Sequence, residues 1–164
     1  KGLDKDIINS ELKERPWLVF GWVDLRMKTE NNMRIIYYSA ENEPSCERLQ
    51  RVIEMNFPRE HIETCRSIEA LSQLLEQPIP ELLIVVLLTA SREELSGIMM
   101  LRELLLDRRI ILVLPDDEPE TVSRGHMLRP RFITYRNSDY SDVSVVLGRM
   151  INSCESSCQG NLFL

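Results

Sequence analysis

Two uninterrupted apolar runs constrain the fold of this chain more than any other feature. Leu82–Leu88 and Ile110–Leu114 contain no polar residue, which is typical of parallel strands that helices cover on both faces. Segments with apolar residues at helical spacing lie between such runs. The pattern therefore predicts strands that alternate with helices, the arrangement that builds right-handed β–α–β units. Three shorter strand-like runs occur at Arg34–Tyr38, Ile62–Cys65 and Phe132–Tyr135.

Capping and helix-breaking residues delimit the helices between the strands. Ser45 follows Pro44 and begins an amphipathic helix, and Pro58 ends it. In the segment 116–130 the polar composition and three interrupting prolines and glycines leave room for a short helix only. Further helices are expected after Ser67, at 93–107 and at 141–152.

This alternation predicts an α/β fold, a doubly wound three-layer sandwich of the flavodoxin-like kind with a five-stranded parallel sheet in the order 2-1-3-4-5. The folded domain is expected at 33–152, between an N-terminal extension or arm at 1–32 and a flexible C-terminal tail at 153–164. Trp17 and Trp22, the two tryptophans, lie in the arm. The sequence leaves open whether the arm packs on the core, forms the contact of a homodimer or is the end of a preceding domain.

The composition argues against several classes of protein. A chain of 164 residues with 43 % apolar side chains can bury a core, while its net charge of −6 argues against a nucleic-acid-binding surface. The longest apolar run, Leu82–Leu88, is too short to cross a membrane, and the charged N-terminal residues argue against a signal peptide. The cysteines and histidines lack the spacing of a zinc site. We therefore expect a cytoplasmic protein without metal or cofactor that binds neither nucleic acid nor membranes.

Three segments carry a resemblance to a known family. Pro80–Leu87 followed by Ser96–Leu104 resembles the third strand, phosphorylation loop and third helix of the receiver domain of bacterial two-component response regulators. Phe132–Arg136 is similar to the family's fifth strand. The resemblance covers about Met33–Asn152 and rests mainly on the order of the elements. It implies a receiver of the CheY-like superfamily, with a role in bacterial signal transduction.

The resemblance also implies where a phosphorylation site would lie. In the family, acidic residues after the first strand hold Mg²⁺, and an aspartate ending the third strand accepts the phosphoryl group. A hydroxyl and a lysine at the ends of the fourth and fifth strands bind the phosphate. This chain lacks these groups, so we expect a degenerate pseudo-receiver with no catalytic residue. The corresponding positions are Ser39 and Ala40 with Glu41 beside them, Leu88 or Thr89, Pro115, and Tyr135.

A degenerate site favours a phosphorylation-independent protein–protein interaction module, not an enzyme, that binds a protein partner in a signalling pathway. By resemblance, the interface would lie on the fourth helix, fifth strand and fifth helix. Exposed aromatic side chains often dominate the energy of such interfaces. The residues expected there are Tyr135, Tyr140, Val143 and Val146.

Two alternatives remain open in the sequence. The first is a small-molecule or metal-ion sensor that uses the crevice at the carboxyl end of the sheet. The second is a phosphoaccepting receiver with a displaced site, in which Thr89 accepts the phosphoryl group and Arg136 replaces the lysine. Both depend on whether acidic loop residues gather at one sheet end and bind a divalent ion. Those residues are Glu41, Glu43, Asp116 and Asp117.

Overall fold

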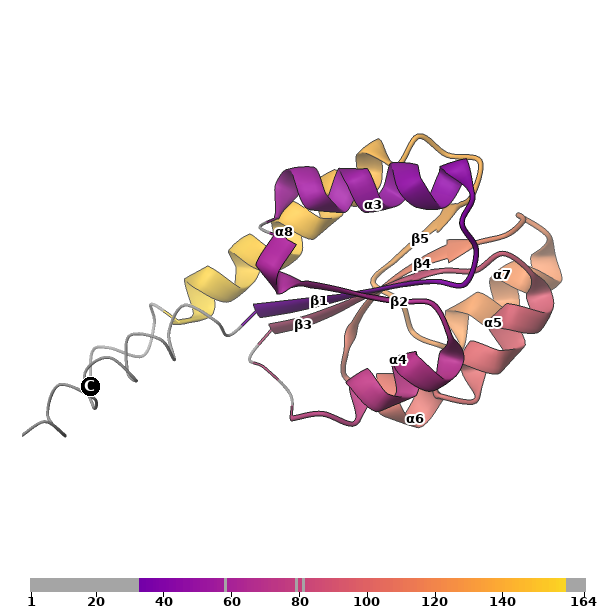
Figure 1. The fold of residues 1–164 in the computed structure, drawn as a ribbon, viewed down its shortest axis with the longest axis horizontal. Coiled ribbons are helices and arrows are strands. Elements are labelled where there is room, and N and C mark those ends of the chain that lie inside the picture. Colours follow the sequence, from indigo (N-terminus) through magenta and orange to yellow (C-terminus); the bar gives the residue numbers. More distant parts are fainter. Residues whose placement is uncertain (1–32, 58, 79, 81, 159–164) are drawn as a thin grey trace, which may run out of the picture. The chain divides into compact units, whose positions relative to one another are not determined.

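The parallel sheet predicted from the apolar runs is confirmed. The computed structural model describes residues 33–158 apart from 58, 79 and 81 (Figure 1). Its five strands form one parallel sheet in the order β2-β1-β3-β4-β5. The strands are β1 (Met33–Ser39), β2 (Ile62–Cys65), β3 (Leu82–Leu88), β4 (Arg109–Leu114) and β5 (Phe132–Tyr135).

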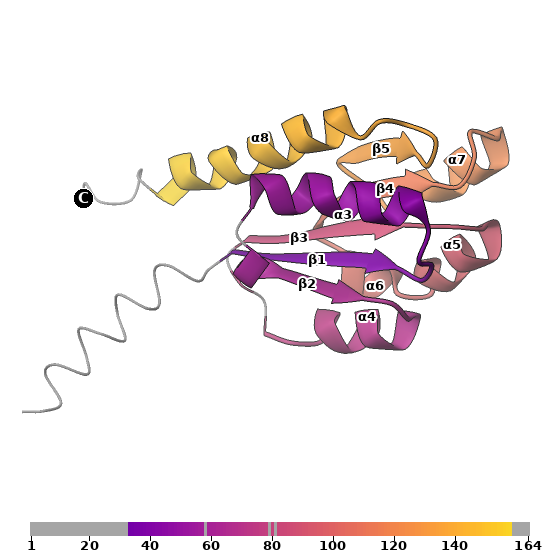
Figure 2. The ribbon, with the colours of Figure 1, turned by 45° about the horizontal axis from the view of Figure 1, so that its top comes forward.

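Helices cover both faces of this sheet, so the fold is the expected three-layer, doubly wound α/β sandwich. Helices α3 and α8 lie side by side on one face, and α4 to α7 cover the other (Figures 1 and 2). The helices are α3 (Pro44–Asn56), α4 (Ile68–Leu75), α5 (Arg92–Met99), α6 (Arg102–Leu105), α7 (Pro119–His126) and α8 (Ser141–Cys158), with a short 3₁₀ turn, η1 (Arg59–His61).

Alternate residues of the central strands enter two separate cores. Tyr37 and Leu88 point to the face under α3 and α8, whereas Tyr38 and Leu87 point to the face covered by α4 to α7. All four are at most 1 % exposed. Burial of one such side chain contributes about 1.5–3 kcal/mol, which explains why a strand covered on both faces has no polar position.

The parallel arrangement brings the carboxyl ends of all strands to one edge of the sheet. Ser39 pairs with Leu88 across β1 and β3, and Leu88 pairs with Val113 across β3 and β4. Leu114 pairs in turn with Tyr135. The segments that follow β1, β3, β4 and β5 therefore meet at this edge, as the sequence predicts for a candidate site.

Two helix boundaries differ from the prediction. The single helix expected at 93–107 is divided into α5 and α6, because Met100 and Leu101 bond to the carbonyls of Gly97 and Ile98, which tightens the turn. Helix α8 continues to Cys158, so the start of the tail at residue 153 was placed too early.

Other expectations concern the ends of the chain. The arm at 1–32, with Trp17 and Trp22, lies outside the described residues, as does the segment 159–164. Among the helices of the described part, none combines the length and apolar character that a bilayer crossing requires.

Candidate functional site

The end of β1 lacks the pair of acidic side chains that would hold Mg²⁺ in a phosphorylation site. The Ser39 side chain is 1 % exposed, and its hydroxyl donates a hydrogen bond to the Glu41 carbonyl at 3.1 Å. Ala40 is exposed and has no polar side chain. The Glu41 carboxylate is held by the Arg136 guanidinium, 3.0 Å away. The position expected for an acidic pair thus contains a turn-forming serine and one carboxylate that already has a cation.

The side chains at the end of β3 are buried, so none of them is accessible for a reaction. Leu88 is 1 % exposed and belongs to the core under α3 and α8. Thr89, the next residue, is fully buried, and its hydroxyl donates to the Val113 carbonyl at 2.8 Å. Its backbone N–H donates to the same carbonyl at 3.0 Å. A leucine side chain cannot carry a phosphoryl group, and the threonine hydroxyl is committed to the backbone of β4.

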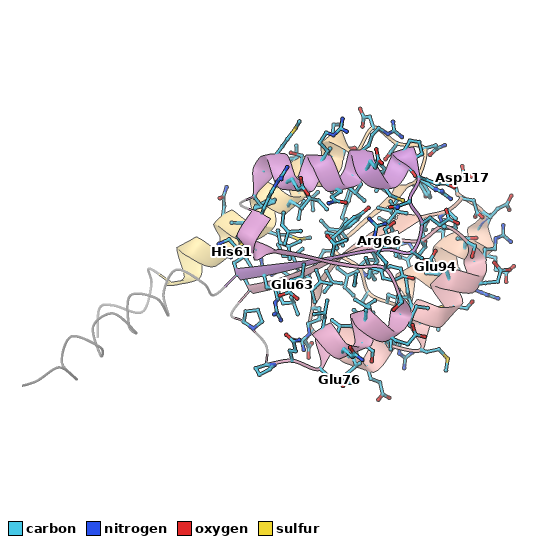
Figure 3. The ribbon with its side chains drawn as sticks, viewed as in Figure 1. His61, Glu63, Arg66, Glu76, Glu94 and Asp117 are labelled. Atoms are coloured by element: carbon cyan, nitrogen blue, oxygen red, sulfur yellow. The ribbon has the colours of Figure 1, made fainter. Side chains whose placement is uncertain are left out.

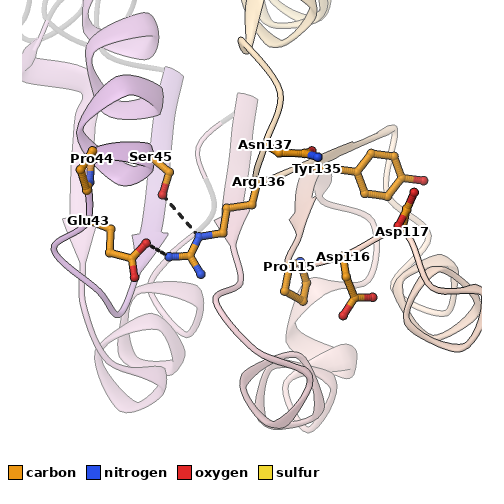
Figure 4. Close-up of a pocket in the computed structure, with 9 residues that line it drawn as sticks. All are labelled: Glu43, Pro44, Ser45, Pro115, Asp116, Asp117, Tyr135, Arg136 and Asn137. Atoms are coloured by element: carbon orange, nitrogen blue, oxygen red, sulfur yellow. Dashed lines mark hydrogen bonds and ion pairs between the residues drawn. The ribbon is translucent and has the colours of Figure 1, made fainter.

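The ends of β4 and β5 line an open cleft of about 660 Å³ (Figure 4). Pro115 and Tyr135 are half-buried and line this cleft, in the places where the resemblance implies a hydroxyl and a lysine. Tyr135 also packs against the core under α4 to α7. Residues that follow β1, β4 and β5 complete the lining: Glu43, Pro44, Ser45, Asp116, Asp117, Arg136 and Asn137.

Arg136 contacts several of the loops at this edge of the sheet. Its guanidinium forms ion pairs with Glu41 and Glu43, at the end of β1 and the start of α3. It also donates to the Ser45 hydroxyl at 3.4 Å (Figure 4). A further hydrogen bond reaches the Ala90 carbonyl at 3.4 Å. Three loops that are distant in sequence therefore share one cation. Because Arg136 is 20 % exposed and the two carboxylates 45 % and 50 %, the energy of each ion pair is reduced by solvent screening.

The four carboxylates of the proposed ion site do not gather. Glu41 and Glu43 pair with Arg136, whereas Asp116 pairs with Arg92, whose Nε lies 3.2 Å from its Oδ2. Asp117 is exposed on the segment before α7 (Figure 3). Within the part of the chain that the structure describes, no group of three or more His, Cys, Asp or Glu side chains could hold a metal ion. The expected cluster is divided because Arg136 holds Glu41 and Glu43 while Arg92 holds Asp116.

One contact at this edge was missed by the sequence reasoning. The Glu94 carboxylate accepts from the Tyr38 hydroxyl at 2.7 Å and from the Ala90 N–H at 2.6 Å. The Ser91 hydroxyl in turn accepts from the Glu94 N–H at 3.2 Å. The Ser-x-x-Glu spacing of a capping box at Ser91–Glu94 is the signal that could have identified this carboxylate. Together these bonds fix the β3–α5 loop against β1.

The environment of Tyr38 makes its hydroxyl a permanent donor. Burial raises the pKa of Tyr38 well above its ordinary value, and the hydrogen bond to Glu94 and the negative charge of that carboxylate raise it further. The proton therefore stays on the tyrosine at every physiological pH.

The expected interface residues are partly in the core, and this corrects the prediction. Tyr140 is 1 % exposed and Val143 is fully buried, both under α3 and α8. The helical spacing marks an apolar face of α8, but that face packs on the sheet and not on a partner. Tyr135 and Val146 are half-buried, so they present part of their surface to solvent.

Loss of the Arg136 cation should have a small, salt-dependent effect. We expect Arg136→Gln to lower the free energy of unfolding by about 1 kcal/mol or less, since the ion pairs are half-exposed and Glu41 and Glu43 would then repel each other. Urea unfolding of Arg136→Gln and of the parent protein at low and high salt measures this difference in the free energy of unfolding. The difference from the parent protein should shrink in high salt, because salt screens exposed charges. The matched control is Arg59→Gln, which removes an ion pair whose arginine is 83 % exposed. An equal loss of stability in Arg136→Gln and Arg59→Gln would contradict the bridging role of Arg136.

The comparisons with known proteins support the fold. No family model and no curated protein matches the chain. A solved structure from Burkholderia pseudomallei, of a protein described as pilus assembly-related, is similar with a TM-score of 0.53 and 17 % sequence identity. The match covers 73 % of this chain and 90 % of that one. At this identity the similarity shows a shared fold, an α/β sandwich around a five-stranded parallel sheet.

Proposed function

We propose that this chain is a pseudo-receiver, a phosphorylation-independent module that binds a protein partner in signal transduction. The observation that carries the proposal is the burial of Leu88, 1 % exposed, at the position where a receiver has its phosphoaccepting aspartate. The neighbouring Thr89 hydroxyl is bonded to a backbone carbonyl and offers no substitute.

The contacts at the sheet end support a domain with one conformation. A phosphoaccepting receiver carries clustered carboxylates whose mutual repulsion destabilises the free form. Here an apolar side chain occupies that position, and the loops are joined by Arg136 and by the Tyr38–Glu94 hydrogen bond. Such a domain has no strained state for phosphorylation to relieve, so its contribution to signalling is a constant binding surface.

Exposure to a phosphodonor tests this function. We expect no gain in mass after incubation with Mg²⁺ and acetyl phosphate, and no amide shifts at Glu41, Thr89 or Arg136 with Mg²⁺ and beryllofluoride. A competent receiver domain in a parallel reaction shows that the reagents are active. A phosphorylated product, or shifts concentrated at these residues, would overturn the proposal in favour of a displaced phosphoaccepting site.

The cleft favours a second candidate, a sensor of a small molecule. Its lining contains a guanidinium, a phenol and three carboxylates within about 660 Å³, which suits a polar metabolite better than an apolar one. A screen of polar metabolites by thermal shift distinguishes the two functions. A saturable rise in melting temperature that Tyr135→Ala abolishes would support the sensor; uniform absence of a shift leaves the interaction module.

A further inference from the structure

Five arginines gather at the edge of the sheet opposite the cleft. They surround two adjacent hollows at the amino ends of β4 and β5, with volumes of about 440 and 370 Å³. Arg131 lines both hollows, which makes them one continuous surface. We call the group the arginine surface; it consists of Arg108, Arg109, Arg129, Arg131 and Arg149.

The arginine surface carries positive charge that the described protein does not neutralise. None of the five arginines forms an ion pair with a carboxylate among the residues that the structure describes, whereas those in ion pairs lie elsewhere. Arg109 bonds to the Met150 carbonyl and the Ser153 hydroxyl, and the Arg108 Nε lies 3.4 Å from the Leu104 carbonyl. Asp107 is the acidic residue in the lining of the two hollows. Arg129, Arg131 and Arg149 are exposed.

The positive side chains of the arginine surface are all of one type. Every lysine of the chain precedes Met33, so all permanent positive side-chain charge from Met33 onward comes from arginine. The planar guanidinium binds a carboxylate through two parallel hydrogen bonds, whereas lysine acts as a point charge. A cluster built from arginine alone suits the recognition of carboxylates by geometry and charge together.

The backbone of the larger hollow is held in a costly conformation. Asp107 and Arg129, which both line it, have φ angles of 64° and 52°, in the left-handed region. Arg129 lies just after α7, where glycine is the usual residue because a side chain is strained there. Non-glycine residues with left-handed backbone angles cluster at binding sites, because the functional role is retained although the conformation lowers stability.

We infer that the arginine surface binds an acidic peptide segment of a protein partner. Apolar side chains beside it, Leu106 with 46 % exposure and Met127 with 50 %, provide contacts that a peptide can use. A nucleic acid or an anionic membrane extends well past this cluster and meets a protein whose net charge is −6. This inference rests on the proposed interaction function and names its partner chemistry. Because the surface lies at the edge opposite Leu88, a positive phosphorylation test would remove the proposed function without altering the binding result.

The test measures binding of a short fluorescein-labelled peptide rich in glutamate and leucine to the full chain by fluorescence anisotropy. We expect saturable binding that weakens as salt is added. The double variant R129E/R131E should raise Kd at least about tenfold, because like charges then face the peptide. Both side chains are exposed, so the variant should fold, and circular dichroism checks this.

The matched control has the same change of charge elsewhere. R51E/R59E reverses two exposed arginines on and after α3 and should leave Kd within about twofold of the parent value. Equal weakening by the two double variants would mean unspecific attraction and overturn the inference. Tighter binding of a single-stranded RNA or of phosphatidylserine vesicles than of the peptide would also overturn it. So would self-association of the chain that R129E/R131E abolishes.

Arg129→Gly separates binding from stability. Glycine removes the strain of the left-handed backbone, so we expect a melting temperature about 2–4 °C higher than that of the parent. The same change removes one guanidinium from the arginine surface, so Kd for the peptide should rise about threefold. A variant that is more stable and binds the peptide unchanged would show that Arg129 has no role in recognition.

Discussion

Replacing Leu88 with aspartate lowers the free energy of unfolding by about 3–5 kcal/mol. The side chain is 1 % exposed among apolar neighbours of β1, β4 and α8, so a carboxylate placed there loses its hydration without gaining a partner. Among the cations at this end of the sheet, Arg136 is engaged by Glu41 and Glu43, and Arg92 is engaged by Asp116. Chemical denaturation of Leu88→Asp and of the parent protein measures the difference.

Leu88→Asn is the control that separates charge from polarity. Asparagine and aspartate have nearly the same size, so both leave the same gap and differ in charge alone. Burial raises the pKa of the introduced carboxyl in the folded state above its unfolded value near 4. The folded state then binds more protons than the unfolded state, so Leu88→Asp loses stability relative to Leu88→Asn as pH rises above about 4. Equal stability of the two variants at acid and neutral pH would show that the position is open to solvent.

The layers of the fold could be predicted because the core leaves a simple signal in the sequence. Leu82–Leu88 is buried at all seven positions, and an unbroken apolar run is the direct consequence of cover on both faces. The order of the strands was predicted from the doubly wound, flavodoxin-like arrangement that such alternating units usually adopt. The division between α5 and α6 left no such signal, because Met100 and Leu101 are good helix formers.

The candidate site was predictable in its position but not in its contacts. Parallel strands bring Ser39, Leu88 and Tyr135 to one edge whatever the side chains are. Which acid pairs with which arginine depends on loop paths that periodicity does not encode, so Asp116 was expected beside Glu41 although it pairs with Arg92. The arginine surface is distributed over three segments of the chain, and no run of basic residues reveals it.

Tyr140→Ala should destabilise the domain by about 3–5 kcal/mol and not merely weaken a partner's binding. The ring is 1 % exposed between α3 and α8, and its hydroxyl donates to the Arg136 carbonyl at 2.9 Å. Burial raises the pKa of this hydroxyl above its ordinary value, so it remains a donor. The tyrosine thus anchors the loop that carries Arg136 while it fills the core. Urea unfolding measures the loss.

Two further variants decide between core and interface. Val145 lies in α8 and is 53 % exposed, so Val145→Ala should change the free energy of unfolding by less than about 0.5 kcal/mol. Tyr140→Phe keeps the ring and loses one hydrogen bond, so a loss of about 1 kcal/mol is expected. If Tyr140→Ala instead kept its stability and lost affinity for a protein partner, the face inferred from the family resemblance would be the true interface. The partner would then bind beside β5 and not at the arginine surface, because Tyr140 lies near the carboxyl end of that strand and the arginines lie at its amino end.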